Sequence, residues 1–254
     1  MHITPEQIEQ FKRDGYFILD NALTEQQLNM LRSECQRFVD VYEAEMEAQG
    51  VTDIGISHYK KRYFVEGRGQ DSPEIAEFLM SELMADVCRA ILGDEAYLFI
   101  EQYVVKVADV GTKFGWHQDS GYIDHYHDPF LTCWCALDDM TIENGTLYVL
   151  PYERAKMHPE DLFEHMVEEE TNDRVGYYGD DPGIPVLVPA GSMVVFSSRL
   201  FHRSGANVSH QIRRAYEARY SAKPIMDKEG RKLHKKAVPI IQNGQRVSPV
   251  REKT

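Results

Sequence analysis

The sequence predicts a mainly β fold, an antiparallel double sheet buttressed by helices near the N-terminus. Three observations lead to this prediction. Helical spacing of apolar residues, with cap residues at the helix ends, is confined to about the first 95 residues. From about residue 97, short β-rich runs alternate with turn signals. A length of 254 residues with 43% hydrophobic composition suffices for one such domain with a substantial core.

The first two predicted helices carry the same start signal. Thr4 supplies a hydroxyl N-cap, followed by proline and, three residues after the cap, by Gln7, while Gly15 ends the helix. Thr24 opens the second helix with the same capping pattern, and Gly50 lies beyond its end. A third helix is predicted from Ser72-Pro73 to Gly93, since its apolar residues recur on one helical face.

The predicted strands are short apolar runs bounded by turn signals such as Glu143-Asn144-Gly145 and Pro189-Ala190-Gly191. The acidic, weakly periodic stretch 152–182 is expected to form a long excursion between strands. Many short strands after a helical segment favour two packed antiparallel sheets. The strands are expected at residues 16–19, 97–107, 130–137, 146–150, 185–188, 193–196 and 215–220.

We expect a single catalytic domain over residues 1–254. It divides into a mostly helical buttress (1–95), a sheet core (96–222) and a basic C-terminal extension (223–254). The extension holds nine Lys or Arg against three Asp or Glu, although the whole chain carries a net charge of −13. A solvated tail or a surface strand docked on an acidic body is expected there.

Composition excludes several classes of partner. The net charge of −13 argues against nucleic acid and anionic membranes. No signal peptide and no run of about 18 apolar residues is found, so a soluble, cytoplasmic protein is expected. The four cysteines lack zinc-finger spacing and are expected to be reduced. A small-molecule substrate is the expected partner, and the sequence carries no signal for an oligomeric state.

The residues His117, Asp119 and His202 form the most informative pattern. Alternate side chains of an extended strand share a face, so His117 and Asp119 are expected to point to one place. His202 follows the probable core strand 193–196 and could supply a second imidazole. Two histidines and one carboxylate leave about three metal positions open, the arrangement of non-heme Fe(II) oxygenases.

Two residues downstream fit a 2-oxo acid bound to the same metal. Ser204 lies two residues after His202, on the same face if the chain stays extended. Arg213 begins the next predicted strand and could hold a distal carboxylate with a forked guanidinium. Adjacent Arg214 competes for this role, because alternation alone does not favour Arg213.

These motifs carry a family resemblance. The chain resembles the phytanoyl-CoA dioxygenase family of Fe(II)- and 2-oxoglutarate-dependent oxygenases over roughly residues 5–222. The resemblance implies a double-stranded β-helix (jelly roll, cupin-like) with Fe(II), 2-oxoglutarate as cosubstrate and O2. It rests on the segments Phe11–Tyr16, Trp116–Asp119 with Gly121-Tyr122, Asn144–Leu147 running to Pro151, His202–Ser209, and Arg213.

The resemblance also implies roles for individual residues. The metal ligands and catalytic residues are then His117, Asp119 and His202. The 2-oxoglutarate pocket would contain Arg213, Ser204, Trp134 and Gln102, with Lys106 as a less secure neighbour. Two departures concern the substrate: Pro151-Tyr152-Glu153-Arg154 replaces the Pro-Gly-Ser-His of the family, and the 152–182 excursion is acidic. The first leaves the contribution of the next loop to substrate binding open. The acidic excursion disfavours a coenzyme A thioester, and the Tyr-rich, acidic surroundings favour a small polar or cationic molecule.

Three other groups of residues are candidates for contact with the substrate. His125 and His127 precede Pro129 in a polar context and are expected in a loop over the mouth of the site. The run Lys60-Lys61-Arg62 is expected to be a solvated charge cluster. Trp116 and Tyr122 flank the metal motif and could border the substrate pocket.

The leading hypothesis is a dioxygenase that hydroxylates an unactivated C–H bond of a small organic molecule and releases succinate and CO2. Asp119 occupies the position that a halide would need, so hydroxylation is favoured over halogenation. A Zn or Mn jelly-roll isomerase or hydrolase could use the same three ligands, but it has no need for Arg213 and Ser204. A non-catalytic small-molecule-binding jelly roll is the third alternative.

Overall fold

The structure is a computed structural model, and it describes residues 2–247. Both predicted capping boxes are present, at the start of α1 (Pro5–Asp14) and α2 (Glu25–Gln49). In each, a threonine hydroxyl accepts a hydrogen bond from the third helical residue, whose glutamine side chain accepts one from the threonine backbone. Glycines in the left-handed conformation end both helices.

The prediction of one continuous third helix was wrong. The segment forms two helices, α3 (Pro73–Leu79) and α4 (Glu82–Leu92), after the short 3-10 helix η1 (Arg68–Asp71). Ser81 takes an extended backbone conformation, and its hydroxyl accepts a hydrogen bond from the Met84 amide. Serine is a favoured N-cap, so it starts a new helix where apolar periodicity predicted continuation.

Two antiparallel sheets face each other. The larger sheet has the order β1-β12-β7-β14-β5-β4-β3-β2, and the smaller has the order β11-β8-β13-β6. Strands of the larger sheet are β1 (Tyr16–Leu19), β2 (Asp53–Ile54), β3 (Ser57–His58), β4 (Arg62–Glu66), β5 (Ala96–Lys106), β7 (Leu131–Ala136), β12 (Met193–Ser197) and β14 (Arg213–Ser221). Strands of the smaller sheet are β6 (Phe114–His117), β8 (Leu147–Leu150), β11 (Ile184–Pro185) and β13 (Phe201–Ser204).

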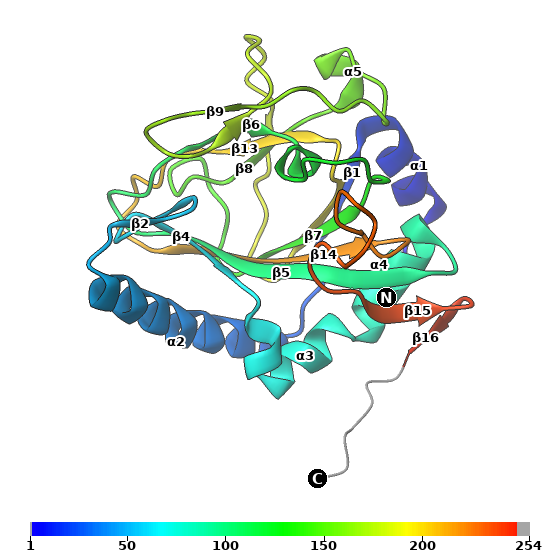
Figure 1. The fold of residues 1–254 in the computed structure, drawn as a ribbon, viewed down its shortest axis with the longest axis horizontal. Helices are drawn as coiled ribbons and strands as arrows, with labels where there is room; N and C mark the ends of the chain where they lie inside the picture. The colour runs from blue at the N-terminus through cyan, green and yellow to red at the C-terminus, as the bar shows by residue number, and fades with distance from the viewer. Residues whose placement is uncertain (1, 248–254) are drawn as a thin grey trace.

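The arrangement confirms the predicted jelly roll with a helical buttress (Figure 1). Helices α2 and α3 lie under the outer face of the larger sheet, and the smaller sheet lies over its inner face. One apolar core fills the space between helices and sheet, and a second fills the space between the sheets. The space between two sheets is where inward side chains from both can meet.

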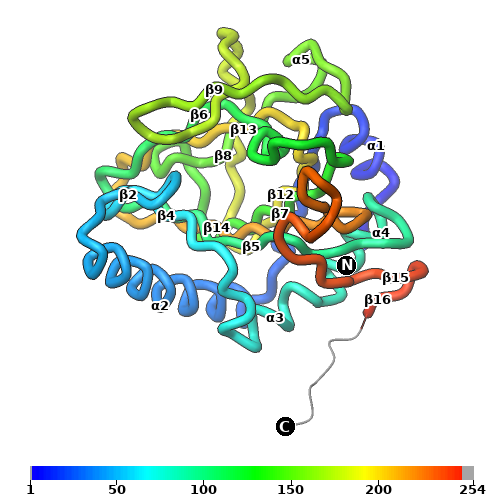
Figure 2. Tube along the Cα trace, in the orientation of Figure 1, coloured from blue at the N-terminus to red at the C-terminus, as the bar shows by residue number. Residues whose placement is uncertain are grey.

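The C-terminal extension is a surface strand on the acidic body rather than a free tail, as far as the described residues run. Strand β15 (Val238–Gln242) pairs with β5 and with β16 (Gln245–Arg246), and Figure 2 shows this red segment beside β5 and α4. Lys236 forms an ion pair of 3.2 Å with the buried Glu101. Residues 248–254 of the predicted extension lie outside the described residues.

The excursion 152–182 contains α5 (Tyr152–Ala155) and the hairpin of β9 (Met166–Val167) and β10 (Arg174–Val175). It is fixed to the larger sheet by an ion pair between Arg62 of β4 and Asp173, both about 1% exposed. The expectation of a solvated Lys60-Lys61-Arg62 cluster was therefore wrong for Arg62. Among residues 2–247, no helix has the length and hydrophobicity required to cross a membrane.

Candidate active site

A cavity of about 250 Å³ lies between the two sheets. Its walls come from β4, β5, β7 and β14 of the larger sheet and from β6, β8 and β13 of the smaller one. Residues far apart in the sequence therefore meet in it. All seven residues predicted for the metal and 2-oxoglutarate sites line this cavity: His117, Asp119, His202, Arg213, Ser204, Trp134 and Gln102.

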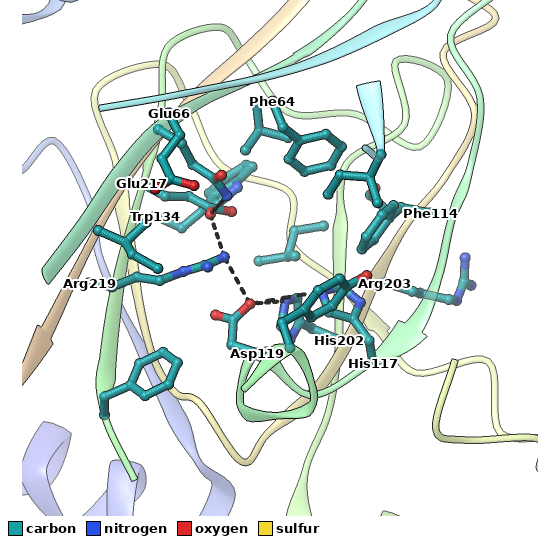
Figure 3. A pocket seen from close by; sticks show the side chains of 18 of the residues that line it. Phe64, Glu66, Phe114, His117, Asp119, Trp134, His202, Arg203, Glu217 and Arg219 are labelled. Atoms are coloured by element: carbon teal, nitrogen blue, oxygen red, sulfur yellow. Dashed lines mark hydrogen bonds and ion pairs between the residues drawn. The ribbon is translucent and has the colours of Figure 1, made fainter. Parts of the chain in front are cut away.

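The two histidines and the aspartate converge on one point (Figure 3). His117 ends β6 and is the direct register partner of His202 on β13. Their Nε2 atoms lie 3.9 and 3.7 Å from Oδ1 of Asp119. All three side chains are buried, and their donor atoms lie within 4.8 Å of one another, close enough to share one metal ion.

The strand that was expected to hold both His117 and Asp119 ends at His117. Asp119 instead begins the 3-10 helix η2 (Asp119–Tyr122). The side chains of His117 and Asp119 still point to the same place because Gln118 between them keeps an extended conformation, with φ −106° and ψ 135°. One extended residue between two side chains is enough to place them on the same side of the chain.

Backbone carbonyls fix the orientation of both imidazoles. Nδ1 of His117 lies 2.9 Å from the Gly115 carbonyl, and Nδ1 of His202 lies 3.1 Å from the Leu200 carbonyl. Because a carbonyl only accepts hydrogen bonds, each Nδ1 carries a proton, and in a neutral ring the lone pair is then on Nε2. Burial, followed by the charge of His202, lowers the pKa of His117 well below its usual value, which keeps that ring neutral.

The carboxylate of Asp119 is held on both oxygens. The Thr132 hydroxyl donates to Oδ2 at 2.7 Å, and Nη2 of Arg219 donates to Oδ1 at 2.9 Å. The same Arg219 nitrogen donates to Glu217 at 2.9 Å. Burial acts to lower the pKa of Arg219, but the carboxylates of Asp119 and Glu217 raise it overall, so the guanidinium stays charged.

The structure separates Arg213 from Arg214. Arg213 lines the cavity, is 1% exposed, and donates from Nη2 to the Gly145 carbonyl at 3.1 Å. Its Nε has no partner among residues 2–247, which leaves donor capacity. Burial lowers the pKa of Arg213 to about 10, so it remains a cation at neutral pH. Arg214 lies outside the cavity lining and is held by Asp138 through two hydrogen bonds of 2.7 and 3.0 Å.

Of the other sequence candidates, Tyr122 lines the cavity, whereas Lys106, Trp116, His125 and His127 lie outside its lining. Lys106 does not line the cavity, because its Nζ donates to the carbonyls of Thr112 and Gly205, both at 2.5 Å. Tyr122 does line the cavity, whereas Trp116 packs against Tyr177 outside it. His125 and His127 are not part of the cavity lining. The His125 ring lies 5.3 Å from the ring of His234, and His234 does line the cavity.

Sequence reasoning missed Glu66, Glu217, Arg219, His234 and Lys235, which line the cavity. Two of them had a usable signal. In an extended strand that starts at Arg213, alternation places Glu217 and Arg219 on the Arg213 face. The other three reach the cavity only because β4 and the C-terminal segment lie beside β5, which no local pattern indicates.

Comparison with known proteins agrees with this site. A family model described as phytanoyl-CoA dioxygenase (PhyH) matches residues 11–215. The chain belongs to the phytanoyl-CoA dioxygenase family. The resemblance inferred from the motifs is thereby confirmed.

Two curated proteins that resemble the chain are distant relatives. A probable phytanoyl-CoA dioxygenase of Caenorhabditis elegans is 25% identical over 238 residues, which cover 86% of this chain and 75% of the relative. An ectoine dioxygenase of Bordetella bronchiseptica is 23% identical over 224 residues, which cover 82% of this chain and 71% of the relative.

A solved structure shares the fold. EvdO2 from Micromonospora carbonacea var. aurantiaca, complexed with 2-oxoglutarate, superposes with a TM-score of 0.67 at 21% identity. The match covers 89% of this chain and 93% of that chain. Family membership and the His117, Asp119 and His202 donor set fit an oxygenase that uses Fe(II), 2-oxoglutarate and O2.

Proposed function

We propose that this chain is an Fe(II)- and 2-oxoglutarate-dependent dioxygenase that hydroxylates an unactivated C–H bond of a small organic molecule, with release of succinate and CO2. One observation carries the proposal: two buried imidazoles, a buried carboxylate and a buried arginine line the same cavity. Neither the triad nor the arginine alone would distinguish this chemistry from zinc catalysis.

Nε2 of His117, Nε2 of His202 and Oδ1 of Asp119 would hold the metal. Bound Fe(II) supplies the coupling between dioxygen, oxidative decarboxylation of 2-oxoglutarate and oxidation of a C–H bond. The protein orients the ligands. The Gly115 and Leu200 carbonyls fix the imidazole tautomers, and Thr132 and Arg219 fix the carboxylate.

Arg213 would bind the distal carboxylate of 2-oxoglutarate, with the Ser204 hydroxyl as a second donor. Trp134 and Gln102 would border the cosubstrate on the larger sheet. Apolar side chains such as Phe64, Phe114 and Leu147 line the same cavity and exclude water from the reacting groups. Arg214 is committed to Asp138 and takes no part.

The choice of hydroxylation rests on Asp119. A halogenating enzyme needs an open metal position for the halide, and here the carboxylate of Asp119, fixed by two hydrogen bonds, would take that position. A zinc or manganese isomerase built on the same triad would provide neither a counterion nor an anionic ligand for the buried Arg213. A guanidinium without an anion is costly to bury.

Anaerobic addition of Fe(II) and 2-oxoglutarate to the apoprotein tests the proposal. A weak visible metal-to-ligand charge-transfer band is expected, and it should require both components. In air, the same mixture should release succinate, and a true substrate should stimulate that release. The absence of the band at saturating 2-oxoglutarate would refute the proposal, and Zn-dependent turnover without 2-oxoglutarate would favour the isomerase or hydrolase.

A further inference from the structure

A row of hydrogen-bonding side chains crosses the floor of the cavity. Glu66 on β4 is the register partner of Gln102 on β5, which is the register partner of Glu217 on β14. All three line the cavity, and Figure 3 shows the two carboxylates close together beside Arg219. Two acids and an amide in one row across three strands form a concentrated set of hydrogen-bond acceptors.

The internal hydrogen bonds of this row leave acceptors available. Nε2 of Gln102 and Nη2 of Arg219 both donate to Oε2 of Glu217, at 2.7 and 2.9 Å. Among residues 2–247, no hydrogen bond engages Oε1 of Glu217 or Oε1 of Gln102, and neither atom is sealed from the cavity. Both oxygens can therefore accept a hydrogen bond from a ligand.

The chain itself places an ammonium group on this row. Nζ of Lys235 lies 2.9 Å from Oε1 of Glu66, and Lys235 lines the cavity. The two side chains are 44% and 40% exposed, and ion pairs this exposed contribute little to stability. A ligand ammonium could therefore replace Lys235 on Glu66 at small cost.

The positive charge of Arg219 is offset by two carboxylates. Its Nη2 already bridges Asp119 and Glu217, each at 2.9 Å, and its side chain is 12% exposed. An anion beside this row would also face the carboxylates of Glu66 and Glu217. Repulsion between like charges in a poorly hydrated cavity disfavours such a ligand.

Part of this row and its neighbours lies beyond the family match. The match ends at residue 215, whereas Glu217, Arg219 and Lys235 all follow it. Arg213, the cosubstrate residue, lies within the match and four residues before Glu217 on the same strand face. Four residues of extended strand span about 13 Å, which separates Glu217 from Arg213 along β14.

We propose that the primary substrate carries a cationic nitrogen, an ammonium or amidinium group, that binds Glu66 and Glu217 and replaces Lys235. This inference rests on the proposed function of the same cavity. The cationic group lies beside Glu217, and Glu217 is joined to Asp119 through Arg219. A single side chain, Arg219, therefore connects the proposed nitrogen site to the metal ligand Asp119.

Head-group-matched probes test this directly. The anaerobic holoprotein is saturated with Fe(II) and 2-oxoglutarate, and the charge-transfer band is recorded first. Calorimetric titrations then compare cyclohexylamine, cyclohexanol and cyclohexanecarboxylate, and likewise butylamine, butanol and butyrate. Each amine is expected to bind roughly tenfold or more tightly than its alcohol, because a hydrogen bond to a charged group contributes more than a neutral one. The carboxylates are expected to bind weakest.

Three variants are expected to change amine binding, two by weakening it and one by strengthening it. Glu66→Gln and Glu217→Gln should each remove most of the preference for amines, and the half-exposed Glu66 leaves little risk to folding. Lys235→Met should increase amine affinity several-fold, because it removes the competing ammonium. Lys232→Met, an exposed lysine of the same segment that is not part of the cavity lining, should change nothing.

The inference and the proposed function fail separately. If the charge-transfer band is present and neither amine binds better than its alcohol, the substrate inference is overturned. Unchanged or weaker amine binding by Lys235→Met would also overturn it. If the band itself is absent, the proposed function is refuted before any probe is added.

Discussion

His117 and His202 are direct partners across the antiparallel pairing of β6 and β13, with ring centroids 4.0 Å apart. Directly opposed residues of an antiparallel pair place their side chains on the same face of the sheet. One ladder position of the smaller sheet thus brings two distant histidines to the cavity. Asp119 joins them because the chain turns into η2 immediately after Gln118.

Loss of either histidine should therefore abolish metal binding. We expect His117→Ala and His202→Ala to weaken Fe(II) binding more than about a hundredfold, since loss of an outer hydrogen-bond partner alone costs 10–100-fold in affinity. Anaerobic Fe(II) titration with 2-oxoglutarate present measures this. His125→Ala is the matched control, because His125 lies outside the cavity lining. Full turnover by either site variant would contradict the ligand assignment.

The Thr132 hydroxyl should tune the metal site through Asp119. Thr132→Val keeps the side-chain shape but removes the 2.7 Å hydrogen bond to Oδ2. We expect Fe(II) affinity to fall about 10–100-fold while the fold is retained. Thr146→Val is the control, because Thr146 is equally buried but donates to the Val186 carbonyl away from the triad. Equal Fe(II) affinities for the two variants would exclude a role of Thr132 at the metal.

Local signals predicted the elements that local interactions determine. The caps at Thr4 and Thr24 involve residues three apart, so the sequence pattern alone indicates the helix starts. Ser81 carries the same kind of signal, but the continuing apolar face concealed it. The two-residue strands β2 and β3 are too short for any alternation pattern to develop.

The candidate site was predictable as far as the family motifs reach. Spacing joined His117 to Asp119, and the resemblance joined both to His202 and Arg213. Arg62 shows the limit of such reasoning: a run of basic residues indicates a solvated surface, yet Arg62 is buried by Asp173 from a segment 111 residues away. Glu66 and Lys235 reach the cavity through tertiary pairing and were missed for the same reason.

Arg213 and Arg214 should differ sharply in their effect on 2-oxoglutarate. We expect Arg213→Ala to raise the KM for 2-oxoglutarate about 30-fold or more, because truncating one partner of a buried charged hydrogen bond costs 2–5 kcal/mol. Arg213→Lys should be intermediate, since lysine keeps the charge but loses the fork. Steady-state succinate release measures this.

Arg214→Ala serves as the adjacent control. It removes the Asp138 ion pair on the helix-facing side of the sheet, so it should lower stability without raising the KM for 2-oxoglutarate. A KM increase caused by Arg214→Ala alone would transfer the role of carboxylate ligand to Arg214.

The ion pair between Arg62 and Asp173 should anchor the excursion 152–182 to the larger sheet. Both side chains are about 1% exposed, and Nη1 of Arg62 lies 3.1 Å from Oδ2 of Asp173. Asp173→Asn leaves a buried guanidinium without a counterion, and breaking a buried pair in this way costs about 3–5 kcal/mol. We expect a loss of that order in the free energy of unfolding by urea, or, if the excursion detaches locally, faster proteolysis within residues 152–182.

The exposed pair of Arg154 and Asp181 gives the comparison within the same excursion. Its side chains are 39% and 24% exposed, so Asp181→Asn should cost no more than about 1 kcal/mol and should leave the proteolysis pattern unchanged. The difference between the two substitutions arises from desolvation, because both remove one carboxylate from one arginine. If Asp173→Asn cost as little as Asp181→Asn and left proteolysis unchanged, the excursion would be held by its apolar contacts instead of by this ion pair.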